Sequence, residues 1–461
     1  MSAMSVEQLR SGVRGHVILP GDETYESTRQ VYNAMIDKRP AIIVRCVDVA
    51  DVIAAVNYAR TNNILTAIRG GGHNGGGLGT CDDGLVIDLS PMKGIRVDPT
   101  ARTVRVQGGC TGGDMDHATH AFGMATPGGT VSSTGVAGLT LGGGIGHLTR
   151  PFGLAIDNLL EVDVVLADGR YVTANEKQNA DLFWAVRGGG GNFGVVTSFL
   201  FRLHPLSTVS AGPTFWPLEQ TPIVMKAYQE FMLQAPDDVS GFLAFLTVPP
   251  VPLFPEALHN RKVCAIIWCS TAAPERAAKL TLKMRSVGTP LLDHVGPMPF
   301  PVLQGLFDPL LPKGMQWYWR ADFVKDFSSE AVAAHLAQAQ SMPAGLSQVH
   351  IYPIDGAAHR VGKGDTAFSY RDANFAVVIV GVDHDPANKQ VITNWCKGYF
   401  DAVHPYSAGG AYVNFMMDEG QERVEASFRE NYSRLALVKS KYDPTNLFRV
   451  NQNIRPATVA A

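Results

Sequence analysis

The residues best placed to do chemistry in this chain are a histidine and the glycines before it. Gly70, Gly71 and Gly72 lead directly into His73, just after the apolar run at residues 64–68. Consecutive glycines let the backbone turn through positive φ and approach a ligand closely, and successive N–H groups can form a concave site for anions. The arrangement predicts a loop that cradles an anionic ligand and holds a histidine ring against it. A simple turn after a strand is the alternative explanation.

Two further glycine-rich segments follow, over residues 130–146 and 187–194. One such motif alone has a high false-positive rate, but three in one chain favour a shared ligand. Many of the 47 glycines lie in these segments. This local enrichment indicates a ligand-cradling backbone rather than low-complexity sequence.

A second candidate for chemistry is the apolar run at residues 348–352, which contains His350 and Tyr352. The period of a strand is two residues, so both side chains would lie on the same face. An unperturbed histidine has a pKa of about 6.5 and is suited to general-base work near neutral pH. A histidine satisfied by ordinary hydrogen bonds in the core or at the surface fits the pattern equally well.

Taken together, these segments resemble the covalent flavoproteins of the vanillyl-alcohol oxidase superfamily, which have a PCMH-type FAD-binding domain. Within it the chain is similar to the branch that contains berberine bridge enzyme and 6-hydroxy-D-nicotine oxidase. The matching segments are spread over residues 40–205 and 410–455. The set is highly specific, whereas each segment alone would be a weak signal.

The resemblance implies FAD as the cofactor, bonded covalently to His73 as an 8α-histidyl flavin. Relatives often add a second bond from a cysteine, at the position occupied here by Val131, and no cysteine lies between Cys110 and Cys264. Cys110 is too far upstream to substitute, so we expect a single attachment. The residues that the resemblance places at the cofactor are Arg69, Gly70, Gly71, Gly72, His73, Asn74, Gly75, Ser133, Thr134, Gly135, Gly138, Leu139, Gly142, Gly143, Gly144, Gly146, Asp157, Asn158, Val195, Val196, Tyr412, Asn451 and Asn453. For the glycines from 142 to 146, close helix–strand packing is the alternative.

On the substrate side, Tyr412 and Asn414 match the family's Tyr-x-Asn-Tyr element, but its last tyrosine is Phe415 here. That tyrosine is a catalytic base in some members, and a phenyl ring cannot take a proton. The remaining catalytic candidates are His350, Tyr352, Tyr412 and Asn414, and we rank His350 first as the base because its ordinary pKa suits neutral pH. The element at residues 317–320 resembles the family's Tyr-Trp-Lys element, and it could either wall an apolar pocket or pack the sheet.

The resemblance implies an oxidase that passes hydride from a small, partly aromatic metabolite to covalently bound FAD, with O₂ as the acceptor and H₂O₂ as the product. Thr134 and Leu139 fall where relatives line the pocket beside the flavin, and small or apolar groups there leave room for O₂. Three alternatives stay open. They are a flavoenzyme of natural-product biosynthesis that catalyses oxidative cyclisation or oxygenation, a carbohydrate oxidase, and a flavin-carrying binding protein without turnover. We expect no metal site.

The first part of the chain reads as strands and helices that deliver these loops. Asp48 is a plausible N-cap for a helix that ends near residues 62–63, and strands at residues 41–45 and 64–68 flank it. The other elements predicted before residue 205 are strands at 85–89, 95–98 and 103–106 and a helix at 114–122. This pattern predicts an α+β fold with a mixed sheet.

After residue 205 proline becomes frequent and longer strands appear. We predict strands at 262–268, 348–352 and 375–380 and helices at 328–340 and 386–399, which together indicate an antiparallel sheet covered by helices. The predicted organisation is an FAD-binding domain over residues 1–205, a substrate-binding domain over 206–408, and a berberine-bridge-like segment over 409–461. By resemblance, that last segment returns to the FAD-binding domain.

Bulk properties are those of an ordinary globular enzyme, since 46% of the residues are hydrophobic and 18% are charged. The length of 461 residues favours more than one core. A net charge of −3 without a basic cluster argues against nucleic-acid or anionic-membrane surfaces.

The six cysteines show no paired or metal-binding spacing, and we expect them reduced and mostly buried. The N-terminus lacks signal-peptide features and no apolar run approaches about 18 residues, so we expect a cytoplasmic enzyme that meets only its small-molecule substrate and O₂. The oligomeric state stays open.

Overall fold

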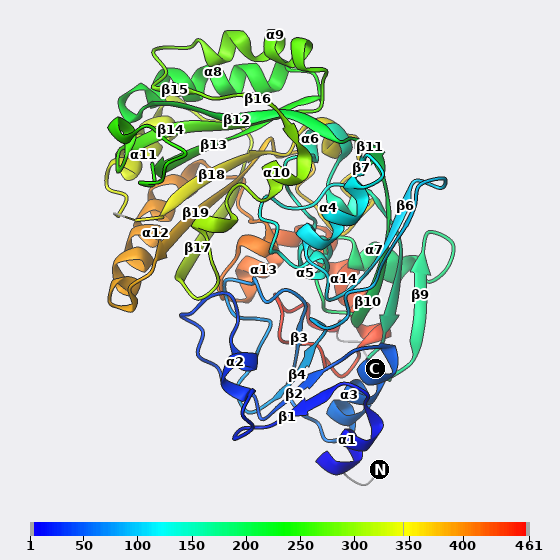
Figure 1. Cartoon of the computed structure of the whole chain (residues 1–461). Coiled ribbons are helices and arrows are strands. Elements are labelled where there is room, and N and C mark those ends of the chain that lie inside the picture. The colour runs from blue at the N-terminus through cyan, green and yellow to red at the C-terminus, as the bar shows by residue number, and fades with distance from the viewer. Residues whose placement is uncertain (1–3, 344, 458–461) are drawn as a thin grey trace.

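The three larger β-sheets of the described residues follow one another along the long axis of the molecule (Figure 1). The computed structural model describes residues 4–343 and 345–457. A small sheet near the N-terminus lies at one end, a large sheet lies at the other, and a five-stranded sheet stands beside the glycine-rich loops between them. No helix within the described residues is long and apolar enough to cross a membrane.

The N-terminal sheet delivers the loop that contains His73. Its strand order is β1-β2-β4-β3, in which β4 pairs in parallel with both β2 and β3 while β1 is antiparallel to β2. The bounds are β1 (His16–Ile18), β2 (Ile42–Arg45), β3 (Thr66–Arg69), β4 (Leu85–Asp88), and the helices α1 (Val6–Gly12), α2 (Tyr25–Arg29) and α3 (Val49–Thr61). The Asp48 side chain accepts a hydrogen bond from the Asp51 N–H and so caps α3, as predicted.

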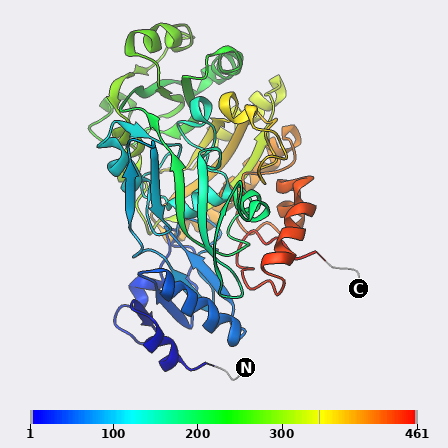
Figure 2. The same cartoon turned by 90° about the vertical axis from the view of Figure 1, so that its right-hand side faces the viewer.

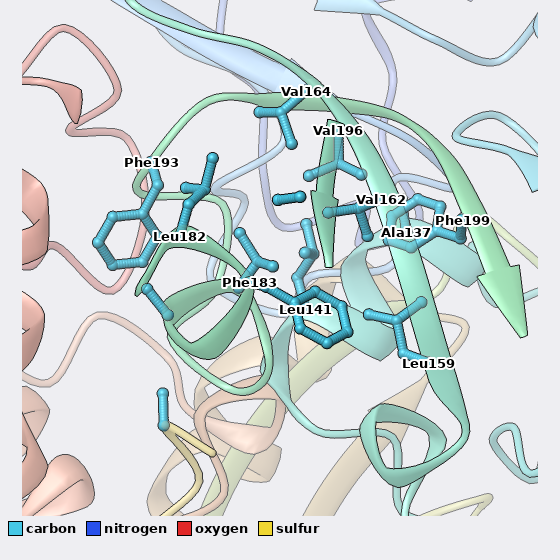
Figure 3. Close-up of a cluster of buried hydrophobic side chains, with 14 of the residues drawn as sticks. Ala137, Leu141, Leu159, Val162, Val164, Leu182, Phe183, Phe193, Val196 and Phe199 are labelled. Atoms are coloured by element: carbon cyan, nitrogen blue, oxygen red, sulfur yellow. The ribbon is translucent and has the colours of Figure 1, made fainter. Parts of the chain in front are cut away.

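The five-stranded sheet supports the helix that lies within the second glycine-rich segment. All its neighbouring strands are antiparallel, in the order β5-β6-β10-β8-β9. The bounds are β5 (Ile95–Asp98), β6 (Thr103–Gln107), β8 (Leu159–Val165), β9 (Tyr171–Asn175), β10 (Val195–Arg202), α4 (Gly112–His120), α5 (Val136–Gly142), α6 (Thr149–Phe152) and α7 (Ala180–Val186). A two-stranded pair of β7 (Met124–Ala125) and β11 (His204–Pro205) lies beside this sheet. Figure 3 shows Ala137 and Leu141 of α5 against Val162 of β8 and Val196 of β10, so apolar packing determines where α5 lies.

The large sheet is antiparallel throughout, in the order β15-β12-β14-β13-β18-β19-β17, with β16 pairing on β12. Its bounds are β12 (Thr208–Pro217), β13 (Val239–Thr247), β14 (Lys262–Ser270), β15 (Leu292–Asp293), β16 (Gly296–Pro299), β17 (Gln316–Val324), β18 (Gln348–Pro353) and β19 (Phe375–Asp383). One face is covered by the helices α8 (Thr221–Gln234), α9 (Pro274–Arg285), α11 (Ser329–Gln340) and α12 (Lys389–Val403). Alternation on β18 sends Val349 and Ile351 toward these helices, whereas His350 and Tyr352 lie on the opposite face.

The C-terminal helices pack their apolar side chains against the five-stranded sheet. Helices α13 (Gln421–Phe428) and α14 (Asn431–Tyr442) share a hydrophobic cluster with β8, β10 and α7, and Figure 2 shows α14 in red beside α7. Two buried ion pairs also join residues before 205 to residues in the 206–408 part of the chain: Arg150 with Asp355, and Arg371 with Asp157. These two parts of the chain are therefore in direct contact.

The predicted α+β fold with an antiparallel sheet covered by helices is confirmed. The predicted elements occur with small shifts at their ends, for example α11 at Ser329–Gln340 against the predicted 328–340. Strand β12 was missed, because Gly212 and Pro213 interrupt its sequence pattern. These two residues fall between the stretches of β12 that pair with β16 and with β15, where a missing N–H breaks neither pairing.

Candidate active site

A cavity of about 300 Å³ lies where the glycine-rich loops meet the uncovered face of the large sheet. Its volume is in the range of small-molecule sites. One side is built from the loop after β3, the segment around α5, the loop before β10 and the C-terminal tail at Asn451 and Gln452. The other side is built from β17, β18 and β19. The predicted site residues that line the cavity are Arg69, Gly70, Gly71, Gly72, His73, Asn74, Thr134, Gly135, Gly138, Leu139, Val196, His350, Tyr352, Tyr412, Asn414 and Asn451.

His73 is held on two sides at the cavity wall. Its ring stacks on Tyr32, with centroids 3.9 Å apart and planes 20° apart, and its Nε2 lies 3.1 Å from the Ser133 hydroxyl. Desolvation by the surrounding protein lowers the pKa of His73 to about 4, and the nearby Lys313 charge acts in the same direction. The imidazole is therefore neutral at physiological pH, with one ring nitrogen left free of the serine.

The loop that carries His73 has the features of an anion cradle. Within the described chain, no group accepts a hydrogen bond from the backbone N–H of Gly71, Gly72, His73 or Asn74. Gly71 also crosses Gly135 so closely that a Cβ on either would lie 2.4 Å from the backbone nitrogen of the other. Free successive N–H groups and glycine-only crossings fit a bound phosphate-containing cofactor.

The far end of the cavity is closed by two segments that are distant in sequence. Residues 189–194 and the tail at Asn451 and Gln452 both line it. They are joined by Lys439, which is fully buried and donates to the Asn192 carbonyl and to the Asp443 carboxylate, each at 2.6 Å. Asn192 in turn donates to the Gln452 carbonyl at 3.1 Å. These buried hydrogen bonds set the relative position of the two segments.

The glycines at 142, 143, 144 and 146 do not line the cavity, contrary to the prediction. A Cβ on Gly142 would lie 2.3 Å from the Asn414 side chain, and one on Gly144 would lie 2.2 Å from the Ala155 side chain. A Cβ on Gly146 would meet the Gly128 carbonyl at 2.1 Å. Close packing, the alternative reading of these glycines, is their role in this structure, and it lets η1 (Ala155–Asp157) and Asn414 approach α5.

Asp157 and Asn158 also lie away from the cavity. Asp157 forms a two-pronged ion pair with Arg371, at 2.7 and 2.8 Å, and Asn158 bonds the carbonyls of Phe152 and Leu154. Both side chains are thus consumed by structural contacts. Four further predicted cofactor residues do not line the cavity, although each is next in sequence to a residue that does: Gly75, Ser133, Val195 and Asn453.

A hydrogen-bonded row crosses the floor of the cavity along β18. The Thr130 hydroxyl lies 3.3 Å from Tyr352 Oη, which lies 2.7 Å from His350 Nδ1. His350 Nε2 lies 2.8 Å from Gln348 Oε1. The shared face predicted for His350 and Tyr352 is confirmed, and Thr130 and Gln348 are residues that sequence reasoning missed.

The expectation that His350 titrates near neutral pH is wrong. Burial lowers the pKa of His350 to about 3, with the neighbouring His147 acting in the same direction, and both ring nitrogens are already bonded within the protein. Burial also raises the pKa of Tyr352. Both groups are therefore neutral at pH 7, and the ordinary pKa of a histidine does not apply on this sheet face.

Tyr412 and Asn414 are engaged mainly in holding α5. Tyr412 Oη accepts hydrogen bonds from the Gly144 N–H at 2.7 Å and from Asn414 Nδ2 at 2.8 Å, and Asn414 Nδ2 also donates to the Leu139 carbonyl. Burial raises the pKa of Tyr412 to about 12. Both residues line the cavity, but these contacts describe positioning groups.

Aromatic side chains wall the rest of the substrate side. Trp317 and Trp319 lie on the cavity face of β17, so the element at residues 317–320 both packs the sheet and lines the cavity. Phe307, Leu311 and Tyr32 complete this wall, and sequence reasoning missed all three because they come from irregular segments with no motif. Their shared signal is only that they are apolar.

All six cysteines are buried and unbridged, as expected. Cys110 is not among the cavity residues, and its sulfur lies 3.9 Å from the Met92 carbonyl oxygen and 3.8 Å from that of Gly94. Burial raises the pKa of the Cys110 thiol to about 11. Val131, in contrast, lines the cavity two residues before Ser133, whose hydroxyl lies 3.1 Å from His73 Nε2.

Comparison with known proteins agrees with this geometry. Residues 40–175 match the family described as FAD binding domain, and residues 411–455 match the family described as berberine and berberine like. An FAD-linked oxidoreductase of Dictyostelium discoideum is 30% identical, over 98% of this chain and 97% of its own length.

Two solved structures have the same fold. The 6-hydroxy-D-nicotine oxidase of Arthrobacter nicotinovorans superposes with a TM-score of 0.85 and 25% identity, over 96% of this chain and 98% of that one. The glucooligosaccharide oxidase of Acremonium strictum, described as carrying a 6-S-cysteinyl, 8α-N1-histidyl FAD, superposes with a TM-score of 0.86 over 98% of this chain and 99% of that one. Its 22% identity supports a shared fold alone.

Proposed function

The chain belongs to the berberine bridge enzyme-like family of FAD-linked oxidoreductases, and from that premise we propose that it is an oxidase of a small, partly aromatic metabolite with FAD attached at His73. The observation that carries the proposal is the cavity itself, which joins an anion-cradling loop to an aromatic pocket with one polar row on its floor. Because the relatives are oxidoreductases, a binding protein without turnover is set aside.

The chain's own residues fit the cofactor that the family implies. Bound FAD supplies the acceptor for a substrate hydride and passes the electrons on to O₂, giving H₂O₂. The free N–H groups from Gly71 to Asn74 are suited to hold its phosphates. His73 is neutral, since its pKa is lowered to about 4, so a ring lone pair is available for the covalent bond at pH 7.

The proton that leaves a substrate O–H or N–H needs an acceptor on the protein. Tyr352 Oη lines the cavity and hydrogen-bonds His350 Nδ1, so it can accept the substrate proton while passing its own to the imidazole. A histidine whose pKa is about 3 is a weak base. Proton transfer must therefore accompany hydride loss, because the substrate hydroxyl becomes strongly acidic only as the hydride leaves the carbon. Tyr352 replaces His350 as the group that meets the substrate, and His350 acts through it.

The walls favour a small planar compound over an oligosaccharide. Trp317, Trp319 and Phe307 offer flat apolar surfaces, whereas a sugar needs many hydrogen-bond partners for its hydroxyls. The position of the second flavin-linking cysteine is Val131 in this chain, which supports a single attachment and a narrower site.

The experiment is stopped-flow reduction of the flavin by candidate aromatic alcohols and amines without O₂, followed by O₂ uptake and H₂O₂ measurement. We expect one H₂O₂ per substrate oxidised. Tyr352→Phe should slow reduction by about 10²–10⁴-fold, the usual contribution of a proton-transfer group, with reoxidation nearly unchanged. The matched control is Tyr406→Phe, at an exposed tyrosine outside the cavity. Oxygen incorporation into the product, or reduction by oligosaccharides alone, would contradict the proposal.

A further inference from the structure

We propose that Gln348 determines substrate specificity by donating a hydrogen bond from its amide group to an acceptor atom on an uncharged, planar substrate. The inference rests on the proposed function, because it names the class of compound that the same cavity takes. Gln348 was not among the residues that the sequence singled out. It lies at the start of β18 and lines the cavity beside His350.

The hydrogen-bonded row determines which way the Gln348 amide points. A phenol is a better donor than an imidazole N–H, and an imidazole nitrogen is a better acceptor than a phenol oxygen. The short contact of 2.7 Å therefore runs from Tyr352 Oη–H to His350 Nδ1. A neutral imidazole then carries its proton on Nε2 and donates it to Gln348 Oε1 at 2.8 Å. The carbonyl of the amide is thus used, and the NH₂ group faces the other way.

The NH₂ group of Gln348 has no partner of its own. No described residue accepts a hydrogen bond from Gln348 Nε2. This nitrogen is nevertheless not fully buried. It is thus available to whatever fills the cavity. An unpaired donor in an apolar site favours ligands that accept from it, and it penalises those that do not.

The neighbours of Gln348 on the sheet are apolar. The register pairs Gln348 with Leu246 on one side and with Val380 on the other, and Val380 pairs in turn with Trp319. Apart from the indole N–H groups of Trp317 and Trp319, which are buried without a partner, the surface around this donor is hydrocarbon and aromatic. A ligand in this row is held by flat apolar contacts and oriented by one hydrogen bond.

The cavity offers no counter-charge to a charged substrate. Among the described lining residues only Arg69 carries a full charge, at the glycine-rich end, where it is paired with Asp88 at 2.9 Å. On the floor, His350 and Tyr352 are neutral at pH 7 because burial lowers the pKa of the first and raises that of the second. Burying an unpaired carboxylate or ammonium there would be costly, so carboxylates and free amines in their charged forms are excluded.

Three probes of one size class test the inference on the flavin-loaded protein: coumarin, indole and coumarin-3-carboxylate. Coumarin has acceptor oxygens and no donor, indole has a donor and no acceptor in the ring plane, and the third probe is anionic. Binding is measured by perturbation of the flavin spectrum and, on the same samples, by titration calorimetry. Neither readout requires turnover, so a failed oxidase assay and a failed binding test are told apart.

We expect coumarin to bind more tightly than indole and the carboxylate to bind least. Gln348→Leu should weaken coumarin by about fivefold to tenfold, the effect of one neutral hydrogen bond, and leave indole within about twofold. Gln316→Leu is the matched control, since it makes the same change at a buried position on β17 that does not line the cavity. The inference fails if Gln348→Leu leaves coumarin binding unchanged, if the anionic probe binds as well as coumarin, or if coumarin does not bind.

Discussion

Single residues in this cavity have chemistry that differs from their ordinary chemistry because the protein removes water from them. His73 and His350 both have pKa values lowered by burial, to about 4 and 3. A neutral His73 keeps a ring lone pair over the whole physiological range, whereas both ring nitrogens of His350 are already hydrogen-bonded within the protein. The same residue type thus has two different environments, decided by what each ring contacts.

The attachment residue can be tested directly. We predict that the purified protein retains its yellow colour through acid precipitation and that His73→Ala loses it on denaturation, because His73 lies in the anion-cradling loop with one ring nitrogen free of the serine. Ser133→Ala is the control, since it removes only the hydroxyl 3.1 Å from His73 Nε2 and should retain covalent flavin. Flavin that washes out of the denatured wild-type protein would show that the attachment is absent.

The number of attachments is a separate prediction. Peptide mass analysis should find one flavin-modified residue, His73, because Val131 occupies the position of the family cysteine and Cys110 is buried away from the cavity. A flavin–cysteine cross-link in any peptide would be incompatible with this arrangement.

Helix α5 contributes residues to the cavity wall, but no side chain caps its N-terminus. It is held by glycine-only contacts with η1 and Asn414, by the apolar cluster in Figure 3, and by the Tyr412 hydroxyl at its C-terminal end. A short helix of this kind has little stability of its own. Its position is therefore determined by its neighbours.

Removing the Tyr412 hydroxyl should show that dependence. Tyr412→Phe leaves the buried Gly144 N–H without its acceptor at 2.7 Å, and we expect the free energy of unfolding to fall by about 1–3 kcal/mol. Urea unfolding of the flavin-loaded protein measures it, with exposed Tyr406→Phe as the control. A variant as stable as the wild type would mean that α5 does not need this contact.

At the scale of the whole molecule, buried ion pairs tie the first part of the chain to the middle part. Arg371 and Asp157 are both buried and form two hydrogen bonds, and Arg150 joins Asp355 while also binding the Met232 and Ala235 carbonyls at the end of α8. The cavity lies between the parts that these pairs connect. Its shape therefore depends on contacts that never touch a ligand.

Breaking one pair should be costly. Arg371→Met leaves the Asp157 carboxylate buried and uncompensated, so we expect a loss of about 3–5 kcal/mol in the free energy of unfolding. The double variant Arg371→Met/Asp157→Asn should recover a large part of that loss, because the orphaned charge is gone. A double variant less stable than the single one, measured by urea unfolding, would argue against this explanation.

The buried histidines also predict how stability depends on pH. Burial lowers the pKa values of His147, His335 and His350 to about 3, 4 and 3, against about 6.5 in the unfolded chain. The unfolded chain therefore binds more protons, so their stabilising effect is complete above about pH 6.5 and is lost as the pH falls toward the folded pKa. Asp116, with a pKa raised by burial to about 7, acts in the opposite sense.

For each of these histidines, we expect the free energy of unfolding to fall by about 2 kcal/mol when the pH is lowered from about 7.5 to about 5.0. His335→Gln should reduce the loss by about that amount, whereas His117→Gln, at an exposed histidine on α4, should not. Urea unfolding at the two pH values provides the measurement. Stability that stays constant over this window would contradict the assignment of these rings as neutral and buried.

Local pattern was sufficient for much of the molecule. The glycine runs, the apolar periodicity of α3 and the alternation on β18 are encoded within a few residues each, and they predicted the loop at His73, the helix with its Asp48 cap and the shared face of His350 and Tyr352. Such features follow from backbone sterics and side-chain period, which need no knowledge of distant residues.

What sequence could not decide depended on groups brought together from far apart. The pKa of His350, the packing role of Gly144 against Ala155 and the free donor of Gln348 all depend on such neighbours. Desolvation and close contact are properties of the folded interior. The same local sequence around His350 is therefore compatible with either a titrating histidine or a neutral one. The motifs determined where the cofactor loop lies along the chain, and the tertiary structure decided which residues around it are left to meet a ligand.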